Sequence, residues 1–271
     1  MEKLNVLRGL LKKLNGAVIA YSGGVDSTFL AVVAHEVLGD RALAVTAVSP
    51  TYSRRELNEA KDLAARFGLR HLIIETDEFA DPHFRANPPD RCYYCKLALF
   101  RRLRRLADEE GLSAVLDGSN LDDLADHRPG HRAARELGIR SPLREVGFTK
   151  EEIRRYSKEL GLPTWDKPAY ACLATRLPYG SEITPEKLAR IEAAEEYLRS
   201  LGFREVRLRD HSPVARLEVG RAEMEEAWRR RAEIAARLHG LGYPYVTLDL
   251  DGFRQGSMNA VLSPSEGGGT P

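Results

Sequence analysis

The feature that most constrains the fold is a short apolar run, a glycine turn and an apolar helical pattern in immediate succession. Residues 17–20 read AVIA, residues 22–27 read SGGVDS, and apolar side chains recur at helical spacing from Phe29 to Val37. A glycine turn between a strand and a helix suits an anion, because glycine lets the backbone approach closely and the helix N-terminus carries partial positive charge. The segment therefore predicts a phosphate-binding loop.

This loop differs from two common phosphate-binding patterns, since it contains neither GxxxxGK(S/T) nor GxGxxG. Its hydroxyl groups can donate hydrogen bonds to phosphate, and Asp26 can either cap the following helix or help to hold Mg²⁺. The candidate ligand-binding residues are Ser22, Gly23, Gly24, Asp26 and Ser27. The alternative is an ordinary capped turn without a ligand.

Strand and helix patterns alternate over the first two-thirds of the chain. Apolar runs typical of strands lie at 17–21, 42–48, 71–75 and 114–118, and helical patterns lie at 27–38, 53–67 and 96–109. This alternation predicts an α/β fold with a doubly wound, mostly parallel sheet that helices cover on both faces. Ligands bind beyond the carboxyl ends of such strands, so residues 22–27, 49–53 and 118–123 should share one rim. Further candidates on that rim are Ser49, Gly118, Asp122 and Asp123.

The pattern changes after about residue 175. Helices are predicted at 185–201, with Thr184 as N-cap, and at 222–239, and strand patterns lie at 206–209, 214–219 and 246–250. We therefore expect an α/β domain at 1–175 and a smaller α+β domain at 176–262. The tail at 263–271 lacks core-forming residues and is expected to be disordered.

Charge and composition narrow the class of protein. The formal net charge of +1 gives no bulk attraction to a long polyanion such as nucleic acid. No run approaches the roughly 18 apolar residues of a membrane span, and the N-terminus has the pattern of an amphipathic helix rather than a signal peptide. Three cysteines, an odd number, do not suit a secreted disulfide scaffold. We therefore expect a cytoplasmic protein.

Two motifs contain the cysteines. Cys92 and Cys95 form a CxxC at the start of a helix, a spacing used for metal ligation and for redox chemistry. Cys172 lies in the stretch WDKPAYACLATRLPYG, with Lys167 and Arg176 nearby in sequence. Cations beside a thiol favour the thiolate, which is the nucleophilic form. The alternative for Cys172 is a buried apolar cysteine that packs against its neighbours.

These motifs together resemble a known family. SGGVDS resembles the pyrophosphate loop of the PP-loop ATP pyrophosphatases, which cleave ATP between its α and β phosphates and adenylate a substrate oxygen. With DRCYYCK, DGSNLDDLADHRPG and WDKPAYACLATRLPYG, nearly the whole chain (residues 5–262) resembles the LarE family of ATP-dependent sacrificial sulfur transferases. The resemblance implies ATP and Mg²⁺ as cofactors, and a pyridinium-3,5-dicarboxylate mononucleotide as the substrate in maturation of the nickel-pincer nucleotide cofactor of lactate racemase. It also implies a homo-oligomer such as a hexamer.

The resemblance leaves two sulfur sources open. In one, Cys172 forms a thioester with the adenylated carboxylate and then gives up its sulfur, which leaves dehydroalanine. In the other, Cys92, Cys95 and Cys172 hold a 4Fe-4S iron–sulfur cluster, whose fourth iron is free to carry an additional sulfide. A reversible dithiol and two incidental cysteines are the remaining interpretations of the CxxC.

Arginines in the second domain are candidates for binding the substrate. Arg207 and Arg209 are two residues apart on a predicted strand and so point to one face, and Arg216 lies on the next strand. With Arg176, they can hold phosphate or carboxylate groups in forked hydrogen bonds. The alternative is a solvated sheet face. The resemblance also suggests acidic residues near the sulfur donor, among Glu196, Glu218 and Glu226.

Other functions agree less well with the sequence. A tRNA thiolase of the same superfamily is the second hypothesis; its long polyanionic substrate favours a basic surface and an RNA-binding module, and neither is evident in the sequence. A non-catalytic nucleotide sensor is the third, although the cysteines and acids that chemistry requires are in place. An amidotransferase is disfavoured because no segment of glutaminase size remains.

Overall fold

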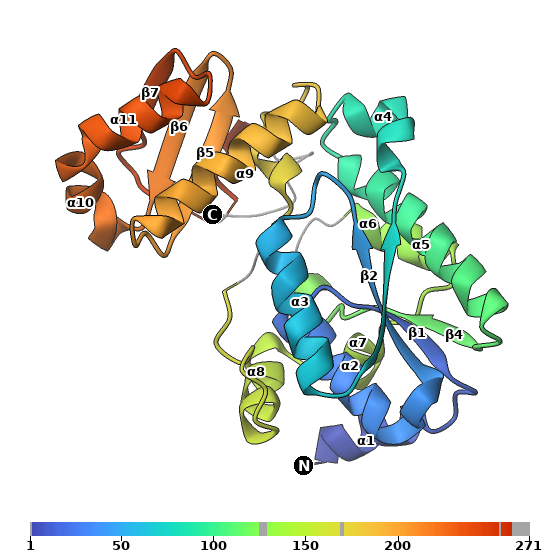
Figure 1. Cartoon of the computed structure of the whole chain (residues 1–271). Helices are drawn as coiled ribbons and strands as arrows, with labels where there is room; N and C mark the ends of the chain where they lie inside the picture. Colours follow the sequence, from blue (N-terminus) through green and yellow to red (C-terminus); the bar gives the residue numbers. More distant parts are fainter. Residues whose placement is uncertain (1, 125–128, 169–170, 255, 262–271) are drawn as a thin grey trace. The chain divides into compact units, whose positions relative to one another are not determined.

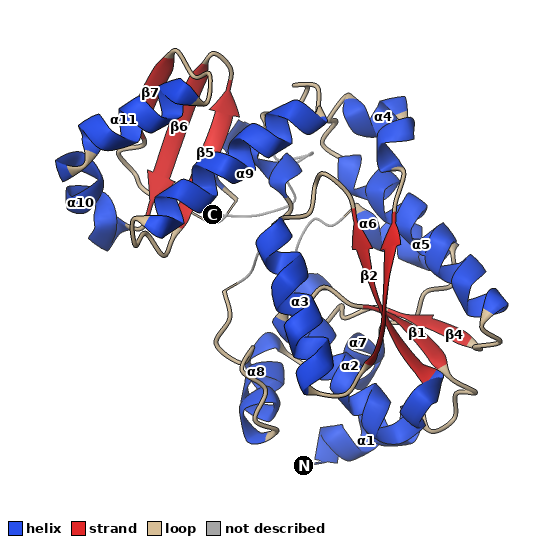
Figure 2. Ribbon diagram, viewed as in Figure 1, coloured by secondary structure: helices blue, strands red, loops and turns tan. Residues whose placement is uncertain are grey.

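The computed structural model describes residues 2–124, 129–168, 171–254 and 256–261. These residues form two compact units (Figures 1 and 2). The second unit consists of Arg85–Pro89 and the described residues from Ala171 onward, and the first unit contains the remainder. The predicted disordered tail at 263–271 lies outside the described residues.

The first unit is built on a parallel four-stranded sheet. Its strands are β1 (Ala17–Ala20), β2 (Ala42–Val48), β3 (Arg70–Glu75) and β4 (Ala114–Leu116). The order in the sheet is β3-β2-β1-β4, with every neighbouring pair parallel. The chain therefore winds outward from β1 in both directions, which confirms the doubly wound α/β prediction and places the β1–β4 switch point beside the phosphate loop.

Helices cover both faces of this sheet. One face packs against α1 (Glu2–Leu11), α2 (Val25–Leu38), α3 (Arg54–Arg66), α7 (Pro142–Val146) and α8 (Lys150–Glu159). The other face packs against α5 (Arg91–Glu109) and α6 (Gly130–Glu136), on the side where Figure 1 draws them in green; the short α4 (Pro82–Arg85) precedes α5. Strand β1 shows the alternation, because Ala17 and Ile19 join the first cluster and Val18 joins the second. In the described part of the chain, no helix combines the length and hydropathy that a membrane span requires.

The second unit contains a three-stranded sheet, consistent with the predicted α+β pattern. Its strands are β5 (Val206–His211), β6 (Val214–Val219) and β7 (Tyr245–Leu248), with β5 and β6 antiparallel and β6 and β7 parallel. Helix α9 (Pro185–Ser200) begins at the predicted cap, where the Thr184 hydroxyl accepts the Lys187 N–H at 3.3 Å.

The predicted helix at 222–239 is wrong, because it is interrupted. The structure has a 3₁₀ turn η5 (Arg221–Glu223), then α10 (Met224–Arg229) and α11 (Arg231–Gly240). Arg230 separates the two α-helices with φ −91° and ψ 11°. No glycine or proline lies near the break, so the sequence carries none of the signals that usually end a helix.

A buried ion pair joins the elements of the second unit. Glu195 lies on the apolar face of α9 and is 2% exposed. Its carboxylate accepts hydrogen bonds from Arg176 at 2.8 and 3.0 Å, from Arg199 at 3.0 Å and from the Leu208 N–H of β5 at 3.2 Å. Burial alone would raise the pKa of Glu195, but the surrounding guanidinium groups, Arg176 foremost, hold that pKa at about 2.

This carboxylate predicts a loss of stability in acid. Because the folded pKa of about 2 lies below the ordinary 4.5, the contribution of Glu195 is complete above pH 4.5 and disappears as the pH falls toward 2. We expect it to amount to roughly 3 kcal/mol. The variant Glu195→Gln should lose this pH dependence, and its free energy of unfolding at pH 7 should fall by about 3–5 kcal/mol, because Arg176 loses its charged partner.

Urea unfolding followed by circular dichroism between pH 2 and pH 7 measures both effects. Glu196→Gln, one residue along on the exposed side of α9, is the matched control and should behave as the parent protein does. If Glu195→Gln keeps the parent's acid dependence, the assignment to Glu195 is wrong.

Candidate active site

The phosphate loop joins β1 to α2 and leaves the start of the helix open. Gly24 is the N-cap of α2, and no side chain caps the helix. Asp26 does not take the capping role: its carboxylate pairs with Lys150 and accepts the Asn120 side-chain amide at 3.3 Å. The first-turn N–H groups of α2 therefore lack a side-chain cap, as an anion site requires.

Glycine is required at position 23 for two reasons. Gly23 has φ +68°, in the left-handed region that disfavours residues with a Cβ. A Cβ at this position would also lie 2.9 Å from the Cβ of Ala60 on α3. The loop is thus packed directly against α3, with no room for a side chain between them.

Two side chains hold the loop by its carbonyl oxygens. The Tyr52 hydroxyl donates to the Ser22 carbonyl at 2.7 Å, and Lys167 Nζ donates to the Gly23 carbonyl at 2.9 Å. Lys167 also pairs with Glu59 Oε2 at 2.8 Å, and only 12% of its side chain is exposed. The structure therefore places Lys167 at the phosphate loop.

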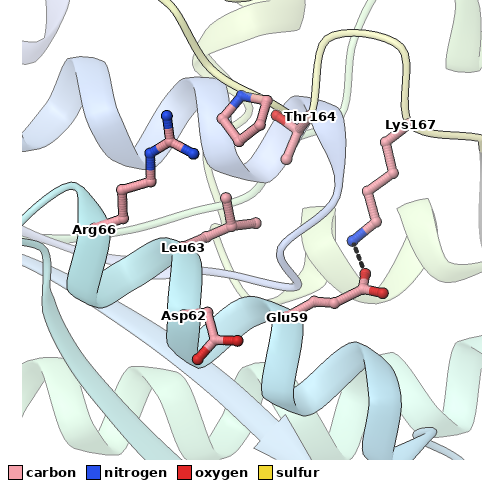
Figure 3. Close-up of a pocket in the computed structure, with 7 residues that line it drawn as sticks. Glu59, Asp62, Leu63, Arg66, Thr164 and Lys167 are labelled. Atoms are coloured by element: carbon pink, nitrogen blue, oxygen red, sulfur yellow. Dashed lines mark ion pairs between the residues drawn. The ribbon is translucent and has the colours of Figure 1, made fainter.

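Figure 3 shows this ion pair at one end of a pocket beside α3. The pocket has a volume of about 280 Å³. Its lining residues are Glu59, Asp62, Leu63, Arg66, Pro163, Thr164 and Lys167.

The three predicted stretches do share one rim. Tyr52, after β2, contacts Ser22, and Asn120, after β4, contacts Asp26. A Cβ on Gly118 would lie 3.0 Å from the Ser27 N atom, so glycine allows the loop after β4 to approach the first turn of α2. Within the loop, the hydroxyls of Ser22 and Ser27 lie 3.0 Å apart and bond to each other.

The remaining rim residues take part in local hydrogen bonds. Ser49 Oγ lies 2.8 Å from the Thr51 hydroxyl. Asp122, in the 3₁₀ turn η3 (Asp122–Leu124), accepts the Lys150 N–H at the start of α8 at 2.7 Å, and Asp123 accepts the Asn120 N–H at 2.9 Å. Among the described residues, no three His, Cys, Asp or Glu side chains gather as a metal site. Both acids thus stabilise turns beside the phosphate loop.

The CxxC lies in the first turns of α5, as predicted. Cys92 is exposed and Cys95 is half-buried, and neither is in a disulfide. A spacing of three residues places the two side chains on the same side of a helix. Both belong to the first unit, whereas Cys172 belongs to the second.

Cys172 is held by its backbone and not by its side chain. Its thiol is free and half-buried, which differs from the fully buried apolar alternative. It precedes the 3₁₀ turn η4 (Leu173–Arg176), and its carbonyl accepts the Thr175 N–H at 3.0 Å, the Thr175 hydroxyl at 2.8 Å and Arg176 at 3.1 Å. Arg176 donates to the Ala171 carbonyl as well, so its guanidinium joins this loop to Glu195.

The arginines of β5 are buried, so the solvated-face alternative is wrong. Arg209 is 5% exposed; it pairs with Glu218 at 2.7 Å and donates to the Thr175 carbonyl at 3.2 Å. Arg216 pairs with the other oxygen of Glu218 at 2.9 Å. Of the predicted acids, Glu218 is therefore buried among these arginines, whereas Glu196 is exposed and Glu226 pairs with Arg229 and Arg230.

Arg207 differs from the other buried arginines. It is 7% exposed, and no carboxylate lies within 4.0 Å of it in the described part of the chain. Among the described residues, its guanidinium donates to the Val206 carbonyl at 2.9 Å and lies 5.2 Å from the centre of the Phe253 ring. Burial, with the nearby charge of Arg176, lowers the pKa of Arg207 to about 10. A buried cation without a paired anion is a candidate binding group for an anionic ligand.

Sequence reasoning did not find three residues of this arrangement. Tyr52 and Glu59 support the phosphate loop from distant parts of the sequence, and no short motif marks them. Glu195 could have been found, because its spacing from Ile191 and Leu198 places it on the apolar face of α9.

Comparisons with known proteins agree with this architecture. A family model described as NAD synthase matches residues 3–90. An uncharacterised protein of Synechocystis is 47% identical over 97% of this chain and 98% of its own length. A tRNA-specific 2-thiouridylase of Rickettsia africae is 28% identical over 58% of this chain and 53% of its own length.

A further relative covers nearly all of both chains. The pyridinium-3,5-bisthiocarboxylic acid mononucleotide synthase of Lactiplantibacillus plantarum is 40% identical over 97% of this chain and 96% of its own length. The chain therefore belongs to the LarE family of PP-loop enzymes, the family of this synthase.

Proposed function

We propose that this protein is an ATP-dependent sulfur transferase that adenylates the carboxylates of pyridinium-3,5-biscarboxylic acid mononucleotide and converts them to thiocarboxylates. The observation that carries the proposal is the 40% identity to the synthase of L. plantarum across almost the entire chain. The product belongs, in this proposal, to the maturation of the nickel-pincer nucleotide of lactate racemase. A cytoplasmic homo-oligomer such as a hexamer is part of the same proposal.

The rim of the first unit is suited to ATP activation. Ser22, Gly23, Gly24 and Ser27 would bind the pyrophosphate end of ATP through N–H and hydroxyl donors, and Ser49 and Gly118 would line the remainder of the nucleotide site. Asp26, Asp122 and Asp123 would supply the hard oxygen ligands that Mg²⁺ prefers, in place of the contacts with Lys150 and Asn120 that they make in this structure. The ion would neutralise phosphate charge as AMP is transferred to the substrate carboxylate and pyrophosphate leaves.

The second unit is suited to an anionic substrate. In the described residues, no carboxylate lies within 4.0 Å of Arg207, and Arg209 and Arg216 share the carboxylate of Glu218, although Arg216 also lies 3.6 Å from Asp249. Burying more guanidinium groups than carboxylates is unfavourable unless an anion completes the site. A phosphate or carboxylate of the nucleotide would supply that anion.

Cys172 supplies the sulfur in the sacrificial route. Its thiolate attacks the adenylated carbonyl carbon, AMP leaves with the electron pair of the C–O bond, and a thioester forms. A base then removes the Cα proton of Cys172, and the Cβ–S bond breaks with its electron pair on sulfur. The thiocarboxylate leaves with the product, and dehydroalanine remains in the chain.

The three cysteines also suit a 4Fe-4S cluster as the sulfur carrier. Cys92 and Cys95 lie on the same side of α5 with no disulfide between them, and with Cys172 they would supply three soft ligands, one for each of three of the four irons. When bound, the cluster would supply a sulfide on its fourth iron. In this route Cys172 is a ligand and is not consumed.

Mass measurements separate the two routes. The anaerobically purified protein is incubated with ATP, Mg²⁺ and the dicarboxylate nucleotide, and the masses of protein and product are taken. A colourless protein that loses roughly 34 Da at Cys172, the mass of H₂S, supports sacrifice. A protein with about four irons and an intact Cys172 supports the cluster.

The cysteine variants make the same distinction. Cys172→Ser should abolish thiocarboxylate formation by either route, whereas Cys92→Ser and Cys95→Ser should abolish it only if the cluster is required. Pyrophosphate release on the first turnover should persist in all three variants, because activation does not use sulfur. Thiocarboxylate formed by Cys172→Ser would contradict both routes.

Gly23→Ala tests the phosphate loop. The left-handed φ and the contact with Ala60 should force the loop out of shape, so the Kd for ATP should rise at least about tenfold, with roughly 1–3 kcal/mol lost in stability. Isothermal titration calorimetry measures the Kd. Gly9→Ala is the matched control, because Gly9 lies in α1 with nothing within 4 Å of an added Cβ. ATP binding by Gly23→Ala that equals that of the control would contradict the loop assignment.

Arg207→Met tests the anion site by effects of opposite sign. Removing an unpaired buried cation should leave the thermal midpoint unchanged or raise it, while the Kd for the substrate nucleotide rises at least about tenfold. Arg209→Met, which breaks the pair with Glu218, should instead lower stability by about 3–5 kcal/mol. Thermal denaturation and nucleotide titration measure the two effects. An Arg207→Met protein that binds the substrate normally would show that Arg207 is not a ligand.

A further inference from the structure

We propose that Tyr52 and Glu59 are positioning residues of the phosphate loop, and that Lys167 acts with them by holding the loop's backbone instead of touching phosphate. Together they would turn the Gly23 and Gly24 N–H groups toward the bound phosphates. The inference rests on the proposed function, because it requires the loop to bind the phosphates of ATP.

The effect of these hydrogen bonds on the N–H groups follows from the geometry of the peptide. In a planar trans peptide the C=O and N–H bonds point in opposite directions. The Ser22 carbonyl shares its peptide with the Gly23 N–H, and the Gly23 carbonyl shares its peptide with the Gly24 N–H. A hydrogen bond that fixes one of these carbonyls therefore also fixes the direction of the N–H group in the same peptide.

The two N–H groups remain available in the structure. The Gly24 N–H contacts only the Ser22 hydroxyl, at the long distance of 3.4 Å. In the part of the chain that the structure describes, the Gly23 N–H makes no hydrogen bond. One N–H without a hydrogen bond among the described residues and one with only a long hydrogen bond, both next to a helix N-terminus, suit the binding of a phosphate group.

The two carbonyl anchors are themselves fixed. Burial, with the nearby charge of Glu56, raises the pKa of Tyr52, so its hydroxyl stays a donor over the physiological pH range. The Lys167 ammonium lies between the Gly23 carbonyl and Glu59, which is 2.8 Å away (Figure 3). Glu59 is fixed in turn by Arg55, at 3.0 Å and one turn away on α3.

Neutralising Glu59 distinguishes two roles for Lys167, because the two roles predict opposite changes in the affinity for anions. If Lys167 bound phosphate directly, a nearby carboxylate would compete for it, and neutralising Glu59 would strengthen anion binding. If Glu59 instead positions Lys167 on the Gly23 carbonyl, neutralising it should weaken anion binding, although a negative charge has been removed. Asp62 lies on the same helix and lines the same pocket, so its neutralisation reports the purely electrostatic effect (Figure 3).

The experiment measures the affinity of the full-length protein for inorganic pyrophosphate, ATP and adenosine by calorimetry. Tyr52→Phe and Glu59→Gln should each weaken pyrophosphate and ATP binding by roughly three- to tenfold, as expected for the loss of one hydrogen bond or its support. Adenosine binding and the thermal midpoint should stay as in the parent protein, which distinguishes loop positioning from general damage to the fold. Asp62→Asn should bind pyrophosphate as well as the parent or slightly better.

Three outcomes would overturn the inference. Glu59→Gln that binds pyrophosphate as tightly as Asp62→Asn would show that Lys167 needs no positioning. A Tyr52→Phe variant that binds pyrophosphate with the parent's affinity would show that the Tyr52 hydrogen bond does not position the loop. A parent protein that binds neither pyrophosphate nor ATP would overturn both this inference and the proposed function. If the parent binds ATP but forms no thiocarboxylate, the proposed function alone fails, and the variants still decide the inference.

Discussion

The contact between Gly23 and Ala60 is the constraint on which the first unit's site depends. It brings the phosphate loop against α3, and only a residue without a side chain can take the φ of +68° there. Because the loop touches α3, Glu59 on that helix and Lys167 beside it come within reach of the Gly23 carbonyl. Helix α3 therefore covers the sheet and also determines the conformation of the loop.

The second unit depends on a different constraint, which is the pairing of buried guanidinium groups with carboxylates. Glu195 and Glu218 are almost fully buried, and each is shared by two arginines. This arrangement fixes the side chains strongly, because every carboxylate oxygen has a charged donor. In the described part of the chain, Arg207 has a main-chain acceptor and an aromatic ring beside it, and the charge of Glu195 acts on it from beyond 4.0 Å. A fold that tolerates this cost without a bound anion is most simply explained by a ligand that supplies one.

The sequence was sufficient for features that depend on local pattern. All four strands of the first sheet, the Thr184 cap and the CxxC at the start of α5 follow from periodicity and capping chemistry. The sequence was insufficient for features that depend on tertiary contacts. Tyr52 and Lys167 lie more than a hundred residues apart and meet only at the loop, and nothing near Arg230 marks the break between α10 and α11. Glu195 was not predicted, although its spacing from Ile191 and Leu198 places it on the apolar face of α9.

In the proposed function, the hydrogen bonds around Cys172 would meet one demand on a sulfur donor, a fixed main chain, and would leave the thiol able to move, which is the other demand. Three donors from Thr175 and Arg176 fix its carbonyl, while the thiol stays half-buried and free of a disulfide. A fixed backbone lowers the entropy that must be lost when the sulfur meets an activated carbonyl. A free side chain can still rotate to place the Cβ–S bond for elimination, or serve as a metal ligand. Because the hydrogen bonds all involve main-chain atoms or neighbouring residues, they would persist in a chain whose Cys172 had lost its sulfur.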